Sequence, residues 1–275
     1  MTPYLLEELL CARLASGPRG SALGRAMCGE AGIHALAPWL AKATSEQHHE
    51  AARQCHQITS LGISVIPAWG YSEALCELDD PPPLLCVRGD PLLLKQRGMG
   101  VVGARRASAS GLAWARDVVM ASDAALVVSG GALGIDCEAH EAALDSGKKT
   151  VVFLGVAVDR VYPAGHRDLF ARILRAGGAL VSEHPPGETT FAYDHARRNR
   201  LIAALSHTLY VAEADAKSGT MGTAHFARNL GRPVRVPEPY AVVARAGLEQ
   251  LLVDGHAHIF TLPSLQSCVT NAVGG

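Results

Sequence analysis

From residue 99 onward, short apolar runs alternate with longer segments whose apolar side chains have helical spacing. The apolar runs are continuous and rich in β-branched residues, which is typical of strands buried on both faces. The alternation predicts a doubly wound, mostly parallel α/β sheet, whose ligands bind at the carboxyl ends of the strands. We expect strands over residues 99–102, 125–128, 150–154, 179–182, 208–211 and 233–236. We expect helices over residues 109–121, 135–146, 167–175, 197–205 and 222–230.

The chain on either side of this region has a different pattern. Leucines recur at helical spacing near the N-terminus, so residues 1–60 are predicted to be a small helical domain, SAM-like or helix-hairpin-helix-like. Two further strand-like runs precede residue 99, and the α/β domain is therefore expected to span residues 61–240. Residues 241–275 are expected to be an irregular tail with one more helix over residues 247–253.

The bulk composition indicates a globular protein without a basic surplus. Of the 275 residues, 48% are hydrophobic and 19% are charged, which is not the composition of a disordered chain. The formal net charge is -1, so any contact with nucleic acid has to come from a local basic patch. No apolar stretch is long enough to span a bilayer, and we expect no membrane partner.

The cysteines and the N-terminus favour a cytoplasmic protein. Glu7 and Glu8 interrupt the first apolar run, which argues against a secretory signal. The cysteines include no C-x-x-C pair, which suits reduced thiols and argues against a zinc site, so we predict no metal and no cofactor. The seven cysteines are Cys11, Cys28, Cys55, Cys76, Cys86, Cys137 and Cys268.

Three glycine-rich turns each follow a predicted strand and precede a predicted helix. Backbone N–H groups at such a turn bind phosphate, together with the partial positive charge of the helix start. Gly103 allows a sharp turn, after which Arg105 and Arg106 place charge beside the helix; the alternative is a loop with two solvated arginines. The candidate phosphate-binding residues of the other two turns are Ser129, Gly130, Gly131, Ser218, Gly219 and Thr220.

An arginine cluster lies at the start of the helix predicted over residues 197–205. It consists of Arg197, Arg198, Asn199 and Arg200. Cations at the positive end of a helix dipole make sense if an anion binds there. The alternative is a solvated face paired with Asp194 or Glu188. We expect the arginine that ends the cluster to face solvent, as Arg105 does.

The turns match neither common nucleotide-binding motif, since G-x-x-x-x-G-K-[ST] and G-x-G-x-x-G are both absent. No catalytic residue is predicted, because no acid–base pair stands in the glycine turns. Glu213 and Asp136 are the nearby carboxylates, and His140 is expected to pack or hydrogen-bond locally. A polynucleotide and a large nucleotide both carry several phosphates, so both ligand classes stay open.

A series of short motifs stands in a fixed order between residues 62 and 237. They are Asp80-Pro81-Pro82-x-Leu84, Arg88-Gly89-Asp90, Val102-Gly103-x-Arg105, Ser129-Gly130-x-Ala132-x-Gly134-Ile135-Asp136-x-x-x-His140, Leu154-Gly155-x-x-x-Asp159-Arg160-Val161-Tyr162-Pro163, Ser182-Glu183-x-Pro185-Pro186-Gly187, Arg198-Asn199-Arg200-x-Ile202-Ala203-x-Leu205-Ser206 and Glu213-Ala214-x-x-x-Ser218-Gly219-Thr220. Together they resemble the motifs of the DNA-processing protein A (DprA/Smf) family of bacteria.

The resemblance implies an extended Rossmann-like DNA-binding domain over residues 61–240, and it adds Arg160 to the phosphate-binding residues. It further implies binding of single-stranded DNA without strong sequence preference, loading of the recombinase RecA, and pairing into a homodimer, in natural transformation and recombination. We expect the last strand, over residues 233–236, to be a sheet edge that needs cover in such a dimer. The chain is too short for the winged-helix module of many relatives, so none is expected.

The chain departs from the family pattern at three places around the turns. Leu133 stands where the family usually has a basic residue, and His195-Ala196 replaces the usual Phe-Pro. Gly222 resembles the pattern of related nucleotide-binding proteins that include cytokinin-activating phosphoribohydrolases. The alternative function is therefore a nucleotide-binding protein or a nucleoside-monophosphate N-glycoside hydrolase.

Overall fold

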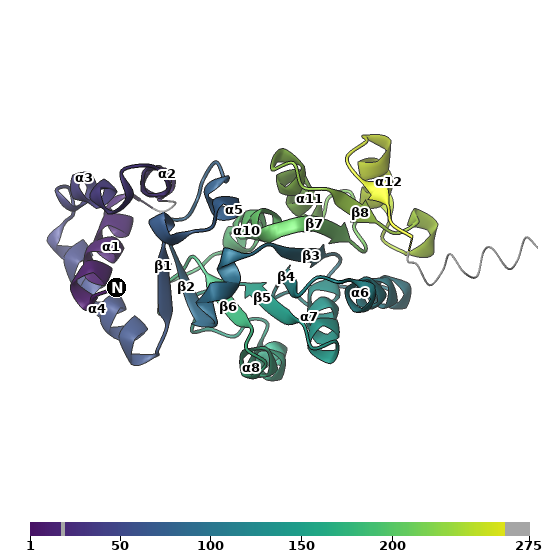
Figure 1. Ribbon diagram of the computed structural model, residues 1–275, viewed down its shortest axis with the longest axis horizontal. Coiled ribbons are helices and arrows are strands. Elements are labelled where there is room, and N and C mark those ends of the chain that lie inside the picture. The colour runs from purple at the N-terminus through teal and green to yellow at the C-terminus, as the bar shows by residue number, and fades with distance from the viewer. Residues whose placement is uncertain (18–19, 262–275) are drawn as a thin grey trace, which may run out of the picture.

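The computed structural model describes residues 1–17 and 20–261, and within these residues nine strands form one mixed sheet (Figure 1). The strand order is β1-β2-β6-β5-β4-β3-β7-β8-β9. β1 and β2 form an antiparallel pair, β2 is antiparallel to β6, and the other neighbours are parallel. The strands are β1 Ser64–Pro67, β2 Leu84–Gly89, β3 Gly98–Val102, β4 Leu126–Gly130, β5 Lys149–Phe153, β6 Ala179–Ser182, β7 Ser206–Val211, β8 Val234–Val236 and β9 His258–Ile259.

Helices cover both faces of the sheet, which confirms the predicted doubly wound α/β fold (Figure 1). Successive strand residues point to opposite faces. Val101 accordingly packs with Trp114 on one face, and Val102 belongs to the core with Leu201 on the other. One layer contains α6 Ala109–Ala121, α7 Ile135–Asp145 and α8 Arg167–Arg175. The other contains α5 Glu73–Cys76, α10 Asn199–Leu205 and α11 Gly219–Asn229.

The N-terminal helices form a separate hydrophobic cluster beside the antiparallel end of the sheet (Figure 1). The helices are α1 Pro3–Ala15, α2 Ser21–Cys28, α3 Ala37–Leu40 and α4 Ser45–Ser60. Thr2 caps α1, and Thr44 with Gln47 forms a capping box at α4. Leu84 and Cys86 of β2 belong to the same cluster, so apolar packing joins these helices to the sheet.

Beyond residue 240 the structure is more regular than the predicted tail. α12 Ala246–Val253 confirms the helix expected there, but the strand β9 was not predicted. β9 pairs with β8, so the expectation that residues 233–236 form an edge of the sheet is wrong. Residues 262–275 of the predicted tail, and Cys268 with them, lie outside the described residues. Short 3-10 helices are η1 Gly32–Leu36, η2 Ala68–Gly70, η3 Pro91–Lys95, η4 Ala164–His166 and η5 Pro239–Ala241.

Two predicted helices have different starts from those expected. The segment over residues 197–205 is two helices, α9 Ala192–Arg197 and α10 Asn199–Leu205. The arginine cluster therefore spans a junction between two helices, and its cations do not all stand at the positive end of one helix dipole. The helix predicted from residue 222 is α11 and begins at Gly219, so that Gly219 and Thr220 lie in its first turn.

Candidate functional site

A cleft opens where the carboxyl end of β3 meets the starts of α10 and α11. Its larger chamber has a volume of about 260 Å³. The residues that line it are Val102, Gly103, Ala104, Arg105, Ala132, Asp136, Ala192, His195, Ala196, Arg198, Asn199, Ile202, Ser218, Gly219, Thr220 and Thr223. Most of these residues follow strands or begin helices, which is where ligands of doubly wound sheets bind. We call this part the polar chamber.

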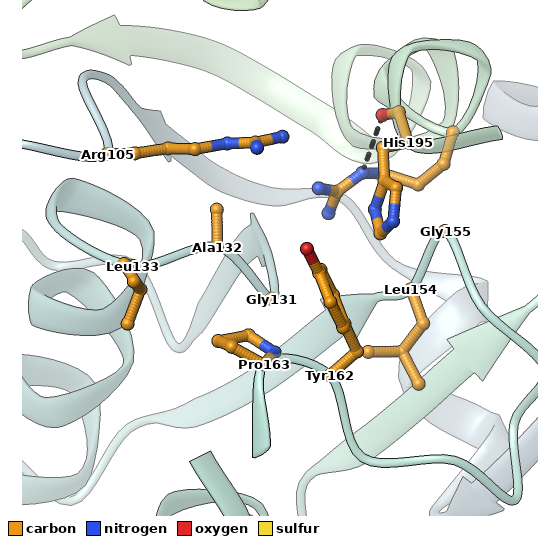
Figure 2. A pocket seen from close by; sticks show the side chains of 10 residues that line it. Arg105, Gly131, Ala132, Leu133, Leu154, Gly155, Tyr162, Pro163 and His195 are labelled. Atoms are coloured by element: carbon orange, nitrogen blue, oxygen red, sulfur yellow. Dashed lines mark hydrogen bonds between the residues drawn. The ribbon is translucent and has the colours of Figure 1, made fainter. Parts of the chain in front are cut away.

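A smaller chamber of about 60 Å³ adjoins it (Figure 2). Leu133, Leu154, Tyr162 and Pro163 give it an apolar wall, and we call it the apolar chamber. The Tyr162 and His195 rings lie with their centroids 5.0 Å apart. Figure 2 shows the Arg105 side chain extended toward His195. Because Arg105, Ala132, His195 and Arg198 line both chambers, the two are parts of one cleft.

The start of α11 presents an anion-binding arrangement to the polar chamber. The first N–H groups of a helix have no intrahelical acceptor, and the helix start carries partial positive charge. Ser218 is the N-cap residue, and its buried Oγ has no hydrogen-bond partner among the described residues. The Thr220 hydroxyl donates to the Gly103 carbonyl at 3.1 Å, and Asn199 Nδ2 donates to the Gly219 carbonyl at 3.2 Å. These bonds fix the loop of Gly103 and the junction before α10 against α11.

Arg198 is a buried cation at the border of the two chambers. It is 5% exposed, and it donates from Nη1 to the Phe153 carbonyl at 2.5 Å and from Nε to the His195 carbonyl at 3.3 Å. Burial lowers the pKa of Arg198, and the negative charge of Asp136 opposes that shift. The guanidinium is therefore fixed from two sides while its residue borders the cleft.

Gly130 lines neither chamber, so the structure does not bring this predicted phosphate-binding residue to the cleft. A Cβ at Gly130 would lie 1.9 Å from Arg198 Nη1 and 2.5 Å from Asp136 Oδ2. The glycine therefore makes room for these two side chains. Ser129 is also assigned wrongly, because its hydroxyl is fully buried and donates to the Val101 carbonyl at 2.5 Å. The neighbouring Gly131 does line the apolar chamber.

The arginines that flank Arg198 belong to a buried ion network instead of the cleft. Arg200 donates to both carboxylate oxygens of Glu183, at 2.5 and 2.7 Å, and to Asp80 Oδ1 at 2.7 Å. Arg197 lies 3.0 Å from Glu183 and 3.6 Å from Asp80. Arg200 is 1% exposed, so the expectations that it faces solvent and binds a ligand phosphate are wrong.

The charges of this network stabilise one another. Burial by itself raises the pKa of Glu183, but the attraction and hydrogen bonds of Arg200, followed by the charge of Arg197, outweigh burial and hold that pKa at about 2. Burial lowers the pKa of Arg200, and Glu183 and Asp80 raise it by more than burial lowers it. The network joins the loop before β2 to the end of β6 and to α10, so one residue in each of three sequence motifs, Asp80, Glu183 and Arg200, has a structural role.

Arg105, Arg106 and Arg160 are exposed, as expected for arginines that meet a ligand. Arg105 alone of these three lines the cleft. Sequence reasoning identified Leu133 and His195 as departures from the family pattern but did not count them, or Tyr162, among the binding residues. The signal for Tyr162 was its place in the segment that follows β5, because the segment after a strand's carboxyl end borders the ligand site.

The carboxylates near the turns are placed very differently. Glu213 is 1% exposed and accepts from the Ser108 N–H at 2.8 Å and the Ala244 N–H at 2.7 Å, so it holds two loops together outside the cleft. Asp136 does line the polar chamber, and burial raises its pKa against the opposing charge of Arg198. His140 is buried with Thr150 at 2.7 Å and the Gly130 carbonyl at 2.8 Å, which confirms its local role.

The part of the chain that the structure describes contains no group of three or more His, Cys, Asp or Glu side chains arranged to hold a metal ion. Among the described helices, none combines the length and the apolar character that crossing a membrane requires. The six cysteines of the described residues have free thiols.

The fold and the cleft define a Rossmann-like protein with a polar cleft at the carboxyl ends of its strands. The model of the DNA recombination-mediator protein A family matches residues 63–269. The chain belongs to this family.

Three comparisons place the chain within the family. DNA processing protein DprA of Streptococcus pneumoniae is 38% identical over 165 residues, which are 60% of this chain and 58% of that protein. The crystal structure of DprA from the same species has a TM-score of 0.76 at 27% identity and covers 95% of each chain. DNA processing protein A from Helicobacter pylori, a protein with a described single-stranded DNA binding mode, has a TM-score of 0.66 at 28% identity, over 76% of this chain and 96% of that one.

The matched segments cover 41% of the putative DNA processing protein DprA of Mycobacterium tuberculosis and 64% of DNA processing protein DprA of Bacillus subtilis. The chain therefore spans about half the length of the curated relatives it matches.

Proposed function

We propose that the chain binds single-stranded DNA in the cleft, with phosphate in the polar chamber and an unpaired base at the apolar chamber. With DNA bound in this way, the protein acts in the cytoplasm as a recombination mediator. It loads a RecA-type recombinase onto the strand during DNA uptake in natural transformation. The DNA-contacting residues are Gly103, Arg105, Gly131, Arg198, Asn199, Ser218, Gly219 and Thr220, with Arg106 and Arg160 as outer phosphate contacts.

The continuity of the two chambers carries this proposal. A nucleotide unit has an anionic part and a flat apolar part a few bonds apart, and the cleft offers cations and a helix start beside an apolar wall. Arg105 and Arg198 border both parts, so the same cations serve a phosphate on either side of the base. Membership of the family and the likeness to the Helicobacter pylori protein support DNA as the ligand.

Fluorescence anisotropy of a labelled oligothymidine tests the binding. The logarithm of the affinity should fall linearly with the logarithm of salt, with a slope of about -0.7 for each phosphate contacted. AMP should compete weakly, because it offers one phosphate. An affinity that does not change with salt, or tight binding of AMP without binding of the oligonucleotide, contradicts the proposal.

One observation favours the alternative of an N-glycoside hydrolase. Asp136 is the single carboxylate that lines either chamber among the described residues, and burial raises its pKa, as a general acid or base requires. We nevertheless propose that the chain is not an enzyme, because glycoside hydrolysis ordinarily uses a pair of carboxylates and no second carboxylate lines the cleft among the described residues. The other acid–base group of the lining, His195, lies against the Tyr162 ring. Glu213, the other candidate, lies outside the cleft, and both of its carboxylate oxygens accept hydrogen bonds from backbone N–H groups.

Incubation with AMP and chromatography of the products decides between these functions. We expect no free adenine above the rate in buffer. If the wild type releases adenine and Asp136→Asn does not, the protein is a nucleoside-monophosphate hydrolase and the proposed DNA-binding function is wrong.

The mediator role requires a recombinase and, as we propose, a homodimer of this chain. A dimer cannot form by pairing at the free edge of β8, because β9 covers that edge, and within the described sheet the outer strands are β1 and β9. Light scattering at micromolar concentration should give the mass of a dimer. The RecA ATPase on a strand coated with single-strand-binding protein should rise faster when this chain is added; an unchanged rate contradicts the mediator role.

A further inference from the structure

Two aromatic side chains stand exposed next to each other beside the cleft. Phe191 is 56% exposed and Tyr193 is 58% exposed. Their ring centroids lie 5.6 Å apart and their planes make an angle of 9°. Ala192, which lies between them in the sequence, lines the polar chamber. Single exposed apolar side chains are common on proteins, but two parallel rings at the border of a ligand cleft are not explained by packing.

The backbone beneath these rings is fixed. The Phe191 N–H donates to Asp194 Oδ2 at 2.7 Å, and the Asp194 N–H donates to the Phe191 carbonyl at 3.0 Å. Asp194 itself is 4% exposed, so this double link anchors the start of α9. Rings that project from a fixed backbone can bind without a cost for ordering that backbone.

We propose that Phe191 and Tyr193 form a stacking platform for the nucleobases of a single strand where that strand leaves the polar chamber. The inference rests on the proposed function, because the platform extends the path of the same strand. Stacking on an aromatic ring accepts every base, since every base has a flat π-face. It also requires bases that are free of a partner strand, so the platform selects single strands over duplexes.

The geometry restricts how the bases stack. A base inserted between two rings needs about 6.8 Å, twice the base spacing of 3.4 Å. The centroid separation of 5.6 Å is too small, so the bases stack on the outer faces of the pair. The cleft has a second ring contact at the apolar chamber, where Tyr162, 50% exposed, lies against His195. A strand that extends from the apolar chamber past the polar chamber to α9 therefore meets aromatic rings at two places.

A nucleobase is a better occupant of this platform than a protein side chain because of the neighbouring charge. The polar chamber places Arg105 and the start of α11 next to the rings' segment, and a ligand that spans both must alternate anions with flat apolar groups. A polynucleotide has that alternation. A mononucleotide fills only the cleft, so the platform makes the protein prefer a polymer.

The double variant Phe191→Ala/Tyr193→Ala tests this inference by anisotropy with an oligothymidine of about 20 nucleotides. We expect its affinity to fall about tenfold, with the slope against salt unchanged because no phosphate contact is lost. Tyr240→Ala is the matched control, since Tyr240 is 77% exposed and does not line the cleft. An abasic strand of equal length should bind the wild type weakly and the double variant equally weakly. The unfolding midpoint of the double variant should stay at the wild-type value.

The outcomes separate this inference from the proposed function. If Arg105→Ala weakens binding and the double variant does not, the platform is wrong and the cleft remains. If the wild type binds no oligonucleotide at low salt, the proposed function fails and the platform with it. If the double variant keeps its DNA affinity but changes the molar mass found by light scattering, the rings are a protein–protein contact and the platform is overturned.

Discussion

Arg105 and Arg200 both belong to polar sequence motifs, but Arg105 is exposed at the cleft whereas Arg200 is 1% exposed and bound to Glu183 and Asp80. The two side chains have the same charge, so the difference lies in what surrounds them. Arg200 has two carboxylates within 2.7 Å of its nitrogens. Arg105 has no carboxylate partner among the described residues, and its charge is available to a ligand.

The difference between Arg105 and Arg200 shows that an arginine cluster in a sequence does not by itself mark an anion-binding site. The partners of Arg200 are 120 and 17 residues away in the chain, and the antiparallel pairing of β2 with β6 brings their loops together. The pairing of these strands was not predicted, so neither was the network. A charge is a candidate for ligand binding once the fold has left it without a protein partner.

The largest effect is expected for Arg200→Ala. The substitution leaves Glu183 buried without its main cation, and breaking a buried ion pair in this way costs about 3–5 kcal/mol of the free energy of unfolding. Urea denaturation measures it, with the exposed Arg160→Ala as the control expected to change by no more than about 0.5 kcal/mol. A loss below about 1 kcal/mol together with lost DNA binding would return Arg200 to the ligand-binding residues.

The network should also make the protein sensitive to acid. The folded pKa of Glu183 is about 2, below its ordinary value of 4.5, so the carboxylate stabilises the fold fully above pH 4.5 and loses this contribution as the pH falls toward 2. The loss attributable to Glu183 is on the order of 2–3 kcal/mol. Urea denaturation across this pH range should give a flatter profile for Glu183→Gln than for the wild type. Parallel profiles would show that Glu183 titrates alike in the folded and unfolded states.

Arg105→Ala should have the opposite effect, since it should weaken the binding of single-stranded DNA and leave the free energy of unfolding nearly unchanged. Loss of one phosphate contact should lower the affinity for single-stranded DNA about tenfold and reduce the magnitude of the salt slope by about 0.7. The free energy of unfolding should change by no more than about 0.5 kcal/mol, because the side chain is exposed. Arg175→Ala on α8, also exposed and outside the cleft lining, is the control. Equal binding by both variants would remove Arg105 from the site.

The sequence was sufficient for the parts of the fold that depend on local patterns. Apolar runs gave the parallel strands closely, and α6 and α8 have the predicted bounds. The roles of Ser129 and Gly130 could not be derived, because a buried hydroxyl bond to Val101 and the space needed by Arg198 depend on neighbouring strands. β9 was missed because a strand of two residues has no periodicity to detect.

The smallest effect concerns Leu133, which stands where the resembling family usually has a basic residue. Leu133 is 52% exposed at the wall of the apolar chamber, so a longer charged side chain fits there without repacking. Leu133→Lys adds a cation at this wall of the cleft. One more phosphate contact should raise the affinity for single-stranded DNA about fivefold at about 0.1 M salt, with a salt slope steeper by about 0.7. Anisotropy with Leu133→Gln as the uncharged control measures both, and an equal gain for glutamine would show that charge is not the cause. An unchanged affinity with lysine would mean that the strand does not pass this wall, and that its phosphates lie on the α11 side of the cleft alone.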